Sequence, residues 1–155
     1  MPLLAVAAIN LPTAALLSLD SLKALEASNL TPREKIESLL NQYVLITASK
    51  TDWHLQVWAR ELLNPSPFIG QIFTQKAWPK MQVLLQIFAD YLQLKKNDPR
   101  LYSYFLSAMA PFLLTFLAHN NAIGQYVPQI CTQQELQKNI KTFVFAGLDA
   151  VREKQ

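Results

Sequence analysis

Three helix-start signals divide this 155-residue chain and constrain its fold more than any other feature. The stretch Thr31–Glu34 places a capping threonine, a proline at the first helical position and a glutamate three residues after the cap. Asp98-Pro99 repeats the cap and the proline, and Thr132 with Glu135 forms a second capping box. Each signal precedes apolar residues at helical spacing, so the sequence predicts long helices beginning near residues 32, 100 and 133.

Composition agrees with a helical interpretation. The chain is 51% hydrophobic and 16% charged and has three glycines, which is typical of a compact domain with a substantial core. Runs in which Val or Thr alternate with polar residues are absent, which argues against a β-sandwich or a barrel. We therefore predict an all-α helical bundle.

The middle of the chain carries its most unusual segment, Trp53–Phe68. We predict a short helix that is apolar on nearly every side, is buried, and is stopped by Asn64-Pro65. Arg60 and Glu61 would then need partners inside the protein, either on neighbouring helices or on a bound molecule. A following helix begins at Ser66-Pro67 and kinks or breaks near Trp78-Pro79.

Prolines and glycines set the remaining expectations. Residues 1–28 read as one or two helices with a break near Pro12, and Pro111 should bend the helix that starts near Arg100. Residues 120–128 should be irregular. Gly147 lies within the last helix, where it costs about 1 kcal/mol relative to alanine. We expect the missing side chain to let another helix approach closely.

The sequence argues against an enzyme, a metal site and a nucleic-acid-binding face. The glycine-rich phosphate loops and the common catalytic motifs are absent, and two distant histidines make a weak metal case, so we expect no enzyme, no metal and no cofactor. The net charge of +3 comes from scattered basic residues, unlike a nucleic-acid-binding face. Cys131 is the single cysteine, which fits a reducing compartment, and we expect a cytoplasmic protein.

Two uncharged stretches, Leu3–Leu19 and Leu101–Ala118, raise the alternative of a small membrane-associated helical protein. Polar residues and prolines interrupt both stretches. For the second, we favour a buried core or a subunit interface.

Aromatic and large apolar side chains fall on helix faces that could converge. Each is either core or the lining of an apolar pocket, in which Arg60, Glu61, Gln56 or a tyrosine hydroxyl would orient a ligand. The residues are Tyr43, Trp53, Trp58, Phe68, Trp78, Phe88, Tyr91, Tyr104, Phe105 and Met109. On the last two long helices, Phe112, Phe116, Phe143 and Val144 belong either to the core or to a partner face. Two helices from each of two chains would make a symmetric four-helix interface.

Four segments together resemble the C-terminal ligand-binding and dimerisation domain of TetR-family transcriptional regulators. They are TPREKIESLL at 31–40, ARELLNPSPFI at 59–69, the run from Lys96 to His119, and NIKTFVFAGLDAVR at 139–152. The RELLNPSP segment, with the later Trp78-Pro79, looks most like the CecR-like branch. The pattern of Phe143, Gly147 and Leu148 is common across the family.

The resemblance implies an effector-binding and homodimerisation domain at residues 30–155, after a helical segment at 1–29. It assigns Trp58, Glu61 and Phe105 to a pocket for a small, largely apolar or aromatic effector, and Phe143, Gly147 and Val151 to the interface. Family members bind DNA through an N-terminal helix-turn-helix head, which is not recognisable before Leu30, so we expect no direct DNA binding by this chain. An alternative is an interaction protein that forms heterodimers with a full-length relative.

Overall fold

The computed structural model describes residues 18–47, 60, 61, 63–119, 123–127 and 133–154. The chain divides into two compact units. The first unit comprises Met1–Ser28 and Thr51–Leu84, and the second comprises Asn29–Lys50 and Leu85–Gln155. The regular elements of the described residues are all helical, which confirms the predicted all-α class.

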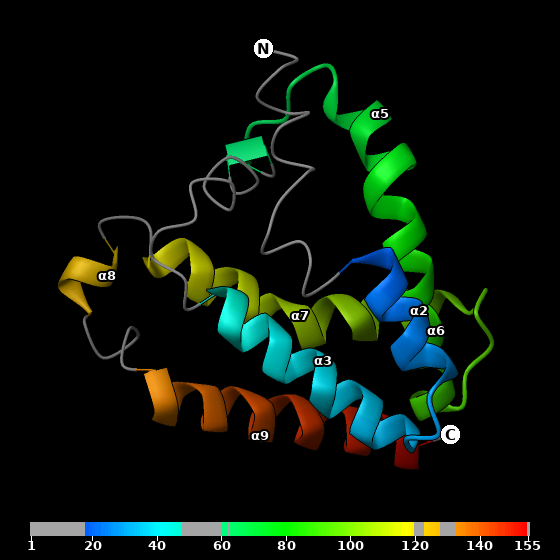
Figure 1. The fold of residues 1–155 in the computed structure, drawn as a ribbon. Coiled ribbons are helices and arrows are strands. Elements are labelled where there is room, and N and C mark those ends of the chain that lie inside the picture. The colour runs from blue at the N-terminus through cyan, green and yellow to red at the C-terminus, as the bar shows by residue number, and fades with distance from the viewer. Residues whose placement is uncertain (1–17, 48–59, 62, 120–122, 128–132, 155) are drawn as a thin grey trace. The chain divides into compact units, whose positions relative to one another are not determined.

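The second unit contains the three long helices that the start signals predict. They are α3 (Pro32–Thr47), α7 (Pro99–His119) and α9 (Gln133–Glu153). Helix α3 packs against α7 and α9, and α7 packs against α9, so the three lie side by side (Figure 1). The end of α6 (Trp78–Leu92) also belongs to this unit.

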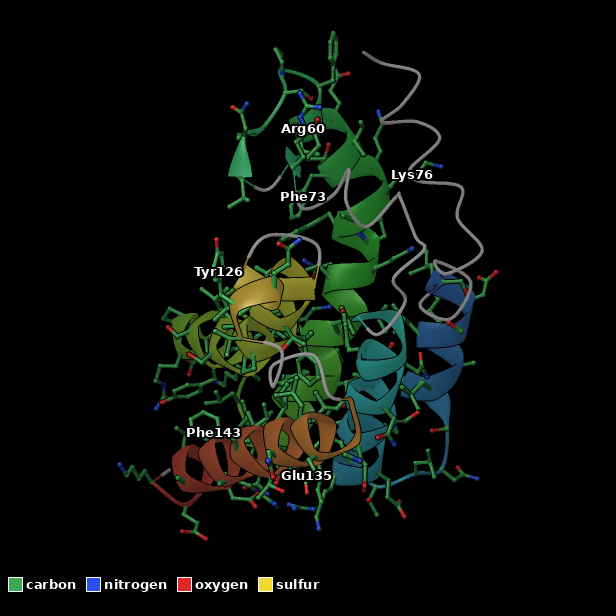
Figure 2. The ribbon with its side chains drawn as sticks, turned by 90° about the vertical axis from the view of Figure 1, so that its left-hand side faces the viewer. Arg60, Phe73, Lys76, Tyr126, Glu135 and Phe143 are labelled. Atoms are coloured by element: carbon green, nitrogen blue, oxygen red, sulfur yellow. The ribbon has the colours of Figure 1, made fainter. Side chains whose placement is uncertain are left out.

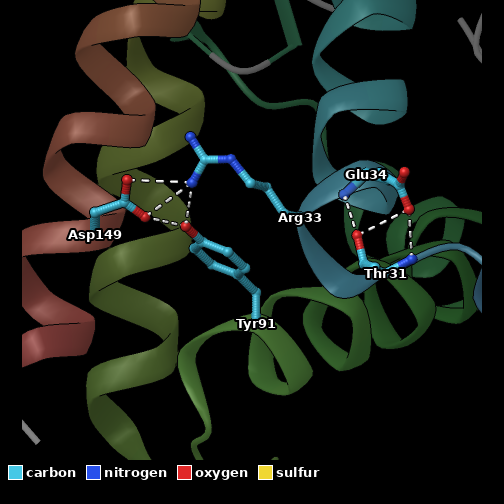
Figure 3. Close-up of polar contacts among 5 residues, drawn as sticks. All are labelled: Thr31, Arg33, Glu34, Tyr91 and Asp149. Atoms are coloured by element: carbon cyan, nitrogen blue, oxygen red, sulfur yellow. Dashed lines mark hydrogen bonds and ion pairs between the residues drawn. The ribbon is translucent and has the colours of Figure 1, made fainter.

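Local hydrogen bonds explain where α3 and α7 begin. Glu34 Oε2 accepts from the Thr31 backbone N–H at 2.8 Å, and the Glu34 N–H donates to Thr31 Oγ1 at 3.3 Å, which is the predicted capping box (Figure 3). Asp98 Oδ1 accepts from the backbone N–H of Arg100 at 2.9 Å at the start of α7. The cap predicted at Thr132 lies outside the described residues, although α9 begins at the next position.

The core of the second unit is apolar and draws on all four of its long segments. Buried side chains recur at helical spacing on each of them, so every helix turns one face inward. The buried residues are Ile36, Leu39 and Leu40 on α3; Leu85, Ile87, Phe88, Ala89, Tyr91 and Leu92 on α6; Leu101, Ala108, Phe112 and Ala118 on α7; and Val144, Phe145 and Leu148 on α9.

Helix α6 ends in a left-handed residue. Gln93 has φ of 56°, and the N–H of the next residue, Leu94, donates to the carbonyl of Ala89 at 3.0 Å. This pairing of the residue after the left-handed position with the carbonyl five residues earlier is a Schellman cap. It turns the chain sharply into the connector before α7.

The region predicted to be irregular contains a short helix, α8 (Ile123–Tyr126), which packs against α7. The expectation of no helix near Gly124 was therefore wrong. A glycine costs a helix only about 1 kcal/mol, and a single turn can form where packing offsets that amount. In the same unit, α7 continues past Pro111 without interruption.

The first unit contains α2 (Leu19–Ala27), α5 (Ile69–Ile72), a π-helical segment η2 (Phe73–Ala77) and the start of α6. Ser18 caps α2 by accepting from the N–H of Ser21 at 3.1 Å. The predicted break near Pro12 lies outside the described residues. Leu22, Val83 and Leu84 are the buried apolar side chains described in this unit.

The sequence predicts a kink or break near Trp78-Pro79, but the helix is continuous there and widens into η2 just before the proline. Proline lacks an N–H, and in an α-helix its ring clashes with the carbonyl four residues earlier. In the wider π turn the Trp78 N–H donates to the carbonyl of Phe73, five residues back. The segment thereby accommodates Pro79 without ending the helix.

Candidate functional site

The predicted ligand-binding residues fall in both units. Tyr43, Phe105 and Met109 belong to the second unit, and Arg60 and Glu61 to the first. Trp58 lies outside the described residues. We describe each group within its own unit.

Glu61 is occupied by a local contact. Its carboxylate accepts from the backbone N–H of Ser66 at 2.9 Å, and this hydrogen bond lowers the pKa of Glu61 below its usual value. Arg60 is exposed. The side chain of Leu63 is 73% exposed, so the prediction that this segment is buried on every side was wrong at that position. Asn64-Pro65 ends the helical turn just after Leu63, which leaves Leu63 at an end rather than within a buried rod.

An aromatic pair in the first unit was not predicted. The rings of Phe73 and Trp78 lie 6.0 Å apart at an interplanar angle of 48°, and both side chains are partly exposed. Residues five apart lie on different sides of an α-helix, but a π turn brings them onto nearly the same side. Phe73 and Lys76, which are three residues apart, point in different directions (Figure 2). The tryptophan-proline pair was the only sequence signal for this distortion.

In the second unit, predicted pocket residues share one apolar face of α7. Phe105 and Met109 are half-buried and are four residues apart, and Phe112 follows three residues later. Phe105 packs edge-on against Phe88 of α6, with ring centroids 5.1 Å apart at 85°. Tyr43 of α3 packs against Phe112 at 6.0 Å. The helices thus bring Tyr43 and Phe105 into ring contacts inside the second unit, whereas Met109 is placed here only by its position four residues after Phe105 on α7.

Tyr43 is the polar group on this aromatic face. Solvent reaches part of the side chain, but its hydroxyl is enclosed by protein atoms, and this burial raises the pKa of Tyr43 to about 12. The hydroxyl therefore stays protonated across the physiological pH range and remains able to donate one hydrogen bond.

Phe112, which the sequence leaves either in the core or at the dimer interface, lies in the interior. Only 2% of its surface is exposed, because its ring faces inward against Tyr43. A side chain buried within one chain adds no surface to an interface, so the face described next leaves it out. The side chain of Phe116, also predicted there, lies outside the described residues, and Val151 is half-buried.

The other side of α9 carries an apolar face that no described residue covers. Phe143 is 75% exposed and extends from the outside of the helix (Figure 2). A Cβ atom added to Gly147 would meet nothing within 4 Å among the described residues, so the expected close approach to Gly147 is not made there by a helix of this chain. We define the α9 stripe as Phe143, Ala146, Gly147 and Ala150, which are all exposed.

Helix α7 presents a similar outer face. Leu106 is 68% exposed, and Tyr102 and Leu113 lie on the same side of the helix and are also exposed. We define these three residues as the α7 stripe. Soluble monomers rarely leave contiguous apolar patches of several hundred square ångströms in water, and such patches generally mark interaction sites.

Two further findings concern metals and membranes. No three His, Cys, Asp or Glu side chains gather into a possible metal site within the part of the chain that the structure describes. None of the helices formed by the described residues combines the length and hydrophobicity needed to cross a membrane.

Comparison with known proteins adds one match. Residues 32–150 match the family model described as HTH-type transcriptional dual regulator CecR, C-terminal domain. The matched region begins and ends with the helices that form the second unit, from the start of α3 to the last turns of α9. A search of curated proteins found no match to the chain.

Proposed function

The chain belongs to the family of CecR C-terminal domains, which are C-terminal domains of TetR-family regulators, and from this we propose that it is an effector-binding and dimerisation domain. In this proposal the α7 and α9 stripes join two copies of the chain. The inner aromatic face of α3 and α7 forms part of the wall of a pocket for a small, largely apolar effector.

The observation that carries the dimer proposal is the exposed Phe143 beside the open space at Gly147. Burying a large apolar side chain contributes about 1.5–3 kcal/mol, whereas association costs roughly 4–15 kcal/mol in lost freedom of motion. Burial of one phenylalanine therefore does not offset the cost of association. A two-fold interface uses each residue twice, so two copies of both stripes bring several large apolar side chains together.

Exchange of Phe143 tests this interface. We expect Phe143→Glu to weaken the dimer at least about a hundredfold, because two like charges would be buried together near the axis. Tyr126→Glu is the matched control, since Tyr126 is an equally exposed aromatic residue (84%) outside both stripes. Sedimentation velocity over a concentration series measures both. Equal dimerisation by the two variants would contradict the proposed interface.

The effector proposal is supported by the chemistry of the inner face. Binding pockets for small molecules are mostly apolar and aromatic, with a few polar groups that orient the ligand. Phe105 and Met109 are of the first kind, and the protonated Tyr43 hydroxyl is of the second. Trp58, Arg60 and Glu61 remain sequence-based candidates for ligand contact.

A ligand screen by thermal shift tests the pocket, with anilinonaphthalene sulfonate and other small aromatic compounds as probes. Tyr43→Phe should lower the affinity for compounds that accept its hydrogen bond about five- to tenfold, as expected for the loss of roughly 1 kcal/mol of binding free energy. Trp58→Ala should weaken binding more. Tyr126→Phe removes an exposed hydroxyl elsewhere and should change nothing. Unaltered binding to Tyr43→Phe would remove Tyr43 from the pocket, and unaltered binding to Trp58→Ala would remove Trp58 from ligand contact.

In this proposal, regulation arises because effector binding is coupled to the arrangement of the two chains in the dimer. In the family name, the helix-turn-helix type refers to DNA binding, and in this proposal DNA is read through such a head and not by residues 32–150. An effector that binds one arrangement of the dimer better shifts the spacing of the heads, with coupling that is typically about 1–3 kcal/mol.

A further inference from the structure

Three helices meet at a cluster of polar and aromatic side chains near the end of α9. Arg33, at the start of α3, donates from Nη1 to Tyr91 Oη at 2.9 Å and to the two Asp149 carboxylate oxygens at 3.1 and 3.2 Å. The Tyr91 hydroxyl also donates to Asp149 Oδ1 (Figure 3). Arg33 and Asp149 are 116 residues apart in the sequence.

Ring contacts complete the cluster. The Arg33 guanidinium lies 4.3 Å from the centroid of the Phe145 ring, and that of Arg152 lies 5.1 Å from the Tyr91 ring. Tyr91 and Phe145 meet edge-to-face, with centroids 6.3 Å apart at 77°. We call Arg33, Tyr91, Phe145, Asp149 and Arg152 the clamp.

The ion pair alone would contribute little. The Arg33 and Asp149 side chains are 52% and 40% exposed, and exposed pairs typically add only about 0–1 kcal/mol. Tyr91 changes this assessment, because it is buried and its hydroxyl bonds to both charged groups. Hydrogen bonds and ring contacts depend on direction, so together they constrain orientation more than they add stability.

The clamp acts on one side of α9. Phe145, Asp149 and Arg152 are spaced by four and three residues, which puts them on one face of a helix. Lys141 lies on the same face and donates to Asn41 Oδ1 of α3 at 2.8 Å. At 100° per residue, Phe143 lies 160° from Phe145 around the helix axis, so the α9 stripe faces away from the clamp.

From this opposition we propose that the clamp is a positioning device that fixes the rotation of α9 about its axis. Core packing of Val144, Phe145 and Leu148 contributes to this rotation, but α9 also carries apolar residues on its other side. Rotation of α9 about its axis would bring Phe143 toward the core and would move Gly147 away from the surface proposed to meet the second copy. The importance of this rotation for the assembly rests on the proposed function, in which the α9 stripe meets a second copy.

The rotation can be measured within one chain. Spin labels on Glu37→Cys of α3 and Lys138→Cys of α9, both exposed positions outside the clamp and the α9 stripe, report the orientation of α9 by double electron–electron resonance. Cys131→Ser leaves these two thiols for labelling, and excess unlabelled protein removes distances between chains. We expect Asp149→Asn and Tyr91→Phe each to shift or broaden the distance distribution.

Asp90→Asn is the matched control. It removes the same charge from an exposed carboxylate whose described contact is a 2.8 Å hydrogen bond from Gln86 within α6. The distance distribution in this variant should equal that of the unsubstituted chain. A merely structural role for the clamp would lower the melting temperature of Asp149→Asn and leave the distances unchanged, and that result would overturn the proposal.

Dimer affinity gives a second readout. Asp149→Asn should weaken the dimer about tenfold although it leaves the α9 stripe intact, and Asp90→Asn should not weaken it. A chain that is strictly monomeric before any substitution would overturn the proposed dimer, whereas the intrachain distances would still decide the role of the clamp. Altered distances with unchanged dimer affinity would show that the rotation is fixed by the clamp but is not used in assembly, and would overturn the link between them.

Discussion

The two sides of α9 differ in whether the described residues of the second unit cover them. On the inner side, Val144 and Leu148 are buried and Asp149 is held by two other helices. On the outer side, Phe143 is exposed beside a glycine with open space above it. Both sides carry apolar residues, so hydrophobicity alone does not separate them. The inner side has its partners within the chain, and in our proposal the outer side has its partner in a second copy.

The largest contrast is expected between Leu148→Ala and Phe143→Ala. Truncating buried Leu148 should lower the free energy of unfolding by about 2–5 kcal/mol, because it removes apolar contacts and leaves a cavity. Phe143→Ala should change the stability of the monomer by less than about 0.5 kcal/mol. Urea unfolding at concentrations too low for dimers measures both. A large loss of stability in Phe143→Ala would mean that Phe143 packs within its own chain.

Gly147→Ala should have opposite effects on the stability of the monomer and on the affinity of the dimer. Alanine favours a helix by about 1 kcal/mol relative to glycine, and the added methyl group meets nothing within 4 Å in the described chain. The monomer should therefore melt at a higher temperature. The dimer should weaken, since the methyl group would hold the facing helices apart. If the dimer instead became tighter, the facing helices would not approach each other at this glycine.

The smallest expected effect is the loss of the stability that Asp149 contributes as the pH is lowered. The hydrogen bond from Tyr91, and then that from Arg33, lower the pKa of Asp149 in the folded chain below its unfolded value of about 3.9. Asp149 thus contributes stability at higher pH, and this contribution is lost as the pH falls through the folded pKa. Because Asp149 is 40% exposed, we expect a fraction of 1 kcal/mol after screening.

Unfolding of the unsubstituted chain and of Asp149→Asn between pH 6 and pH 2 measures this contribution. The stability difference between them should be largest near pH 6 and should disappear at the acid end. A difference that stayed constant with pH would show that the carboxylate charge is not what stabilises the inner side.

Much of the fold was predictable because helix starts depend on neighbouring residues. Thr31 and Glu34 bond to each other, so four consecutive positions of the sequence contain the whole signal. The same holds for Asp98 and Arg100 at the start of α7. The family resemblance, stated from four segments, was confirmed by the match to residues 32–150.

Features that depend on distant residues were not predictable in the same way. The clamp joins Arg33 to Asp149 across 116 residues, and no local pattern indicates that pairing. The sequence left Phe112 either in the core or on a partner face, because an apolar residue on an apolar helix fits both sides, and the contact with Tyr43 identifies its side. The π-helical segment before Pro79 shows how a local signal can identify a distortion without giving its form.

The central claim is that the outer side of α9 is covered by a second copy of the chain. Native mass spectrometry of the purified protein tests it most directly, because it reports the number of subunits and any retained small molecule together. We predict a species of twice the mass of the chain that Phe143→Glu abolishes and Tyr126→Glu preserves. A protein that remains monomeric at tens of micromolar, with Phe143 open to solvent, would contradict the account.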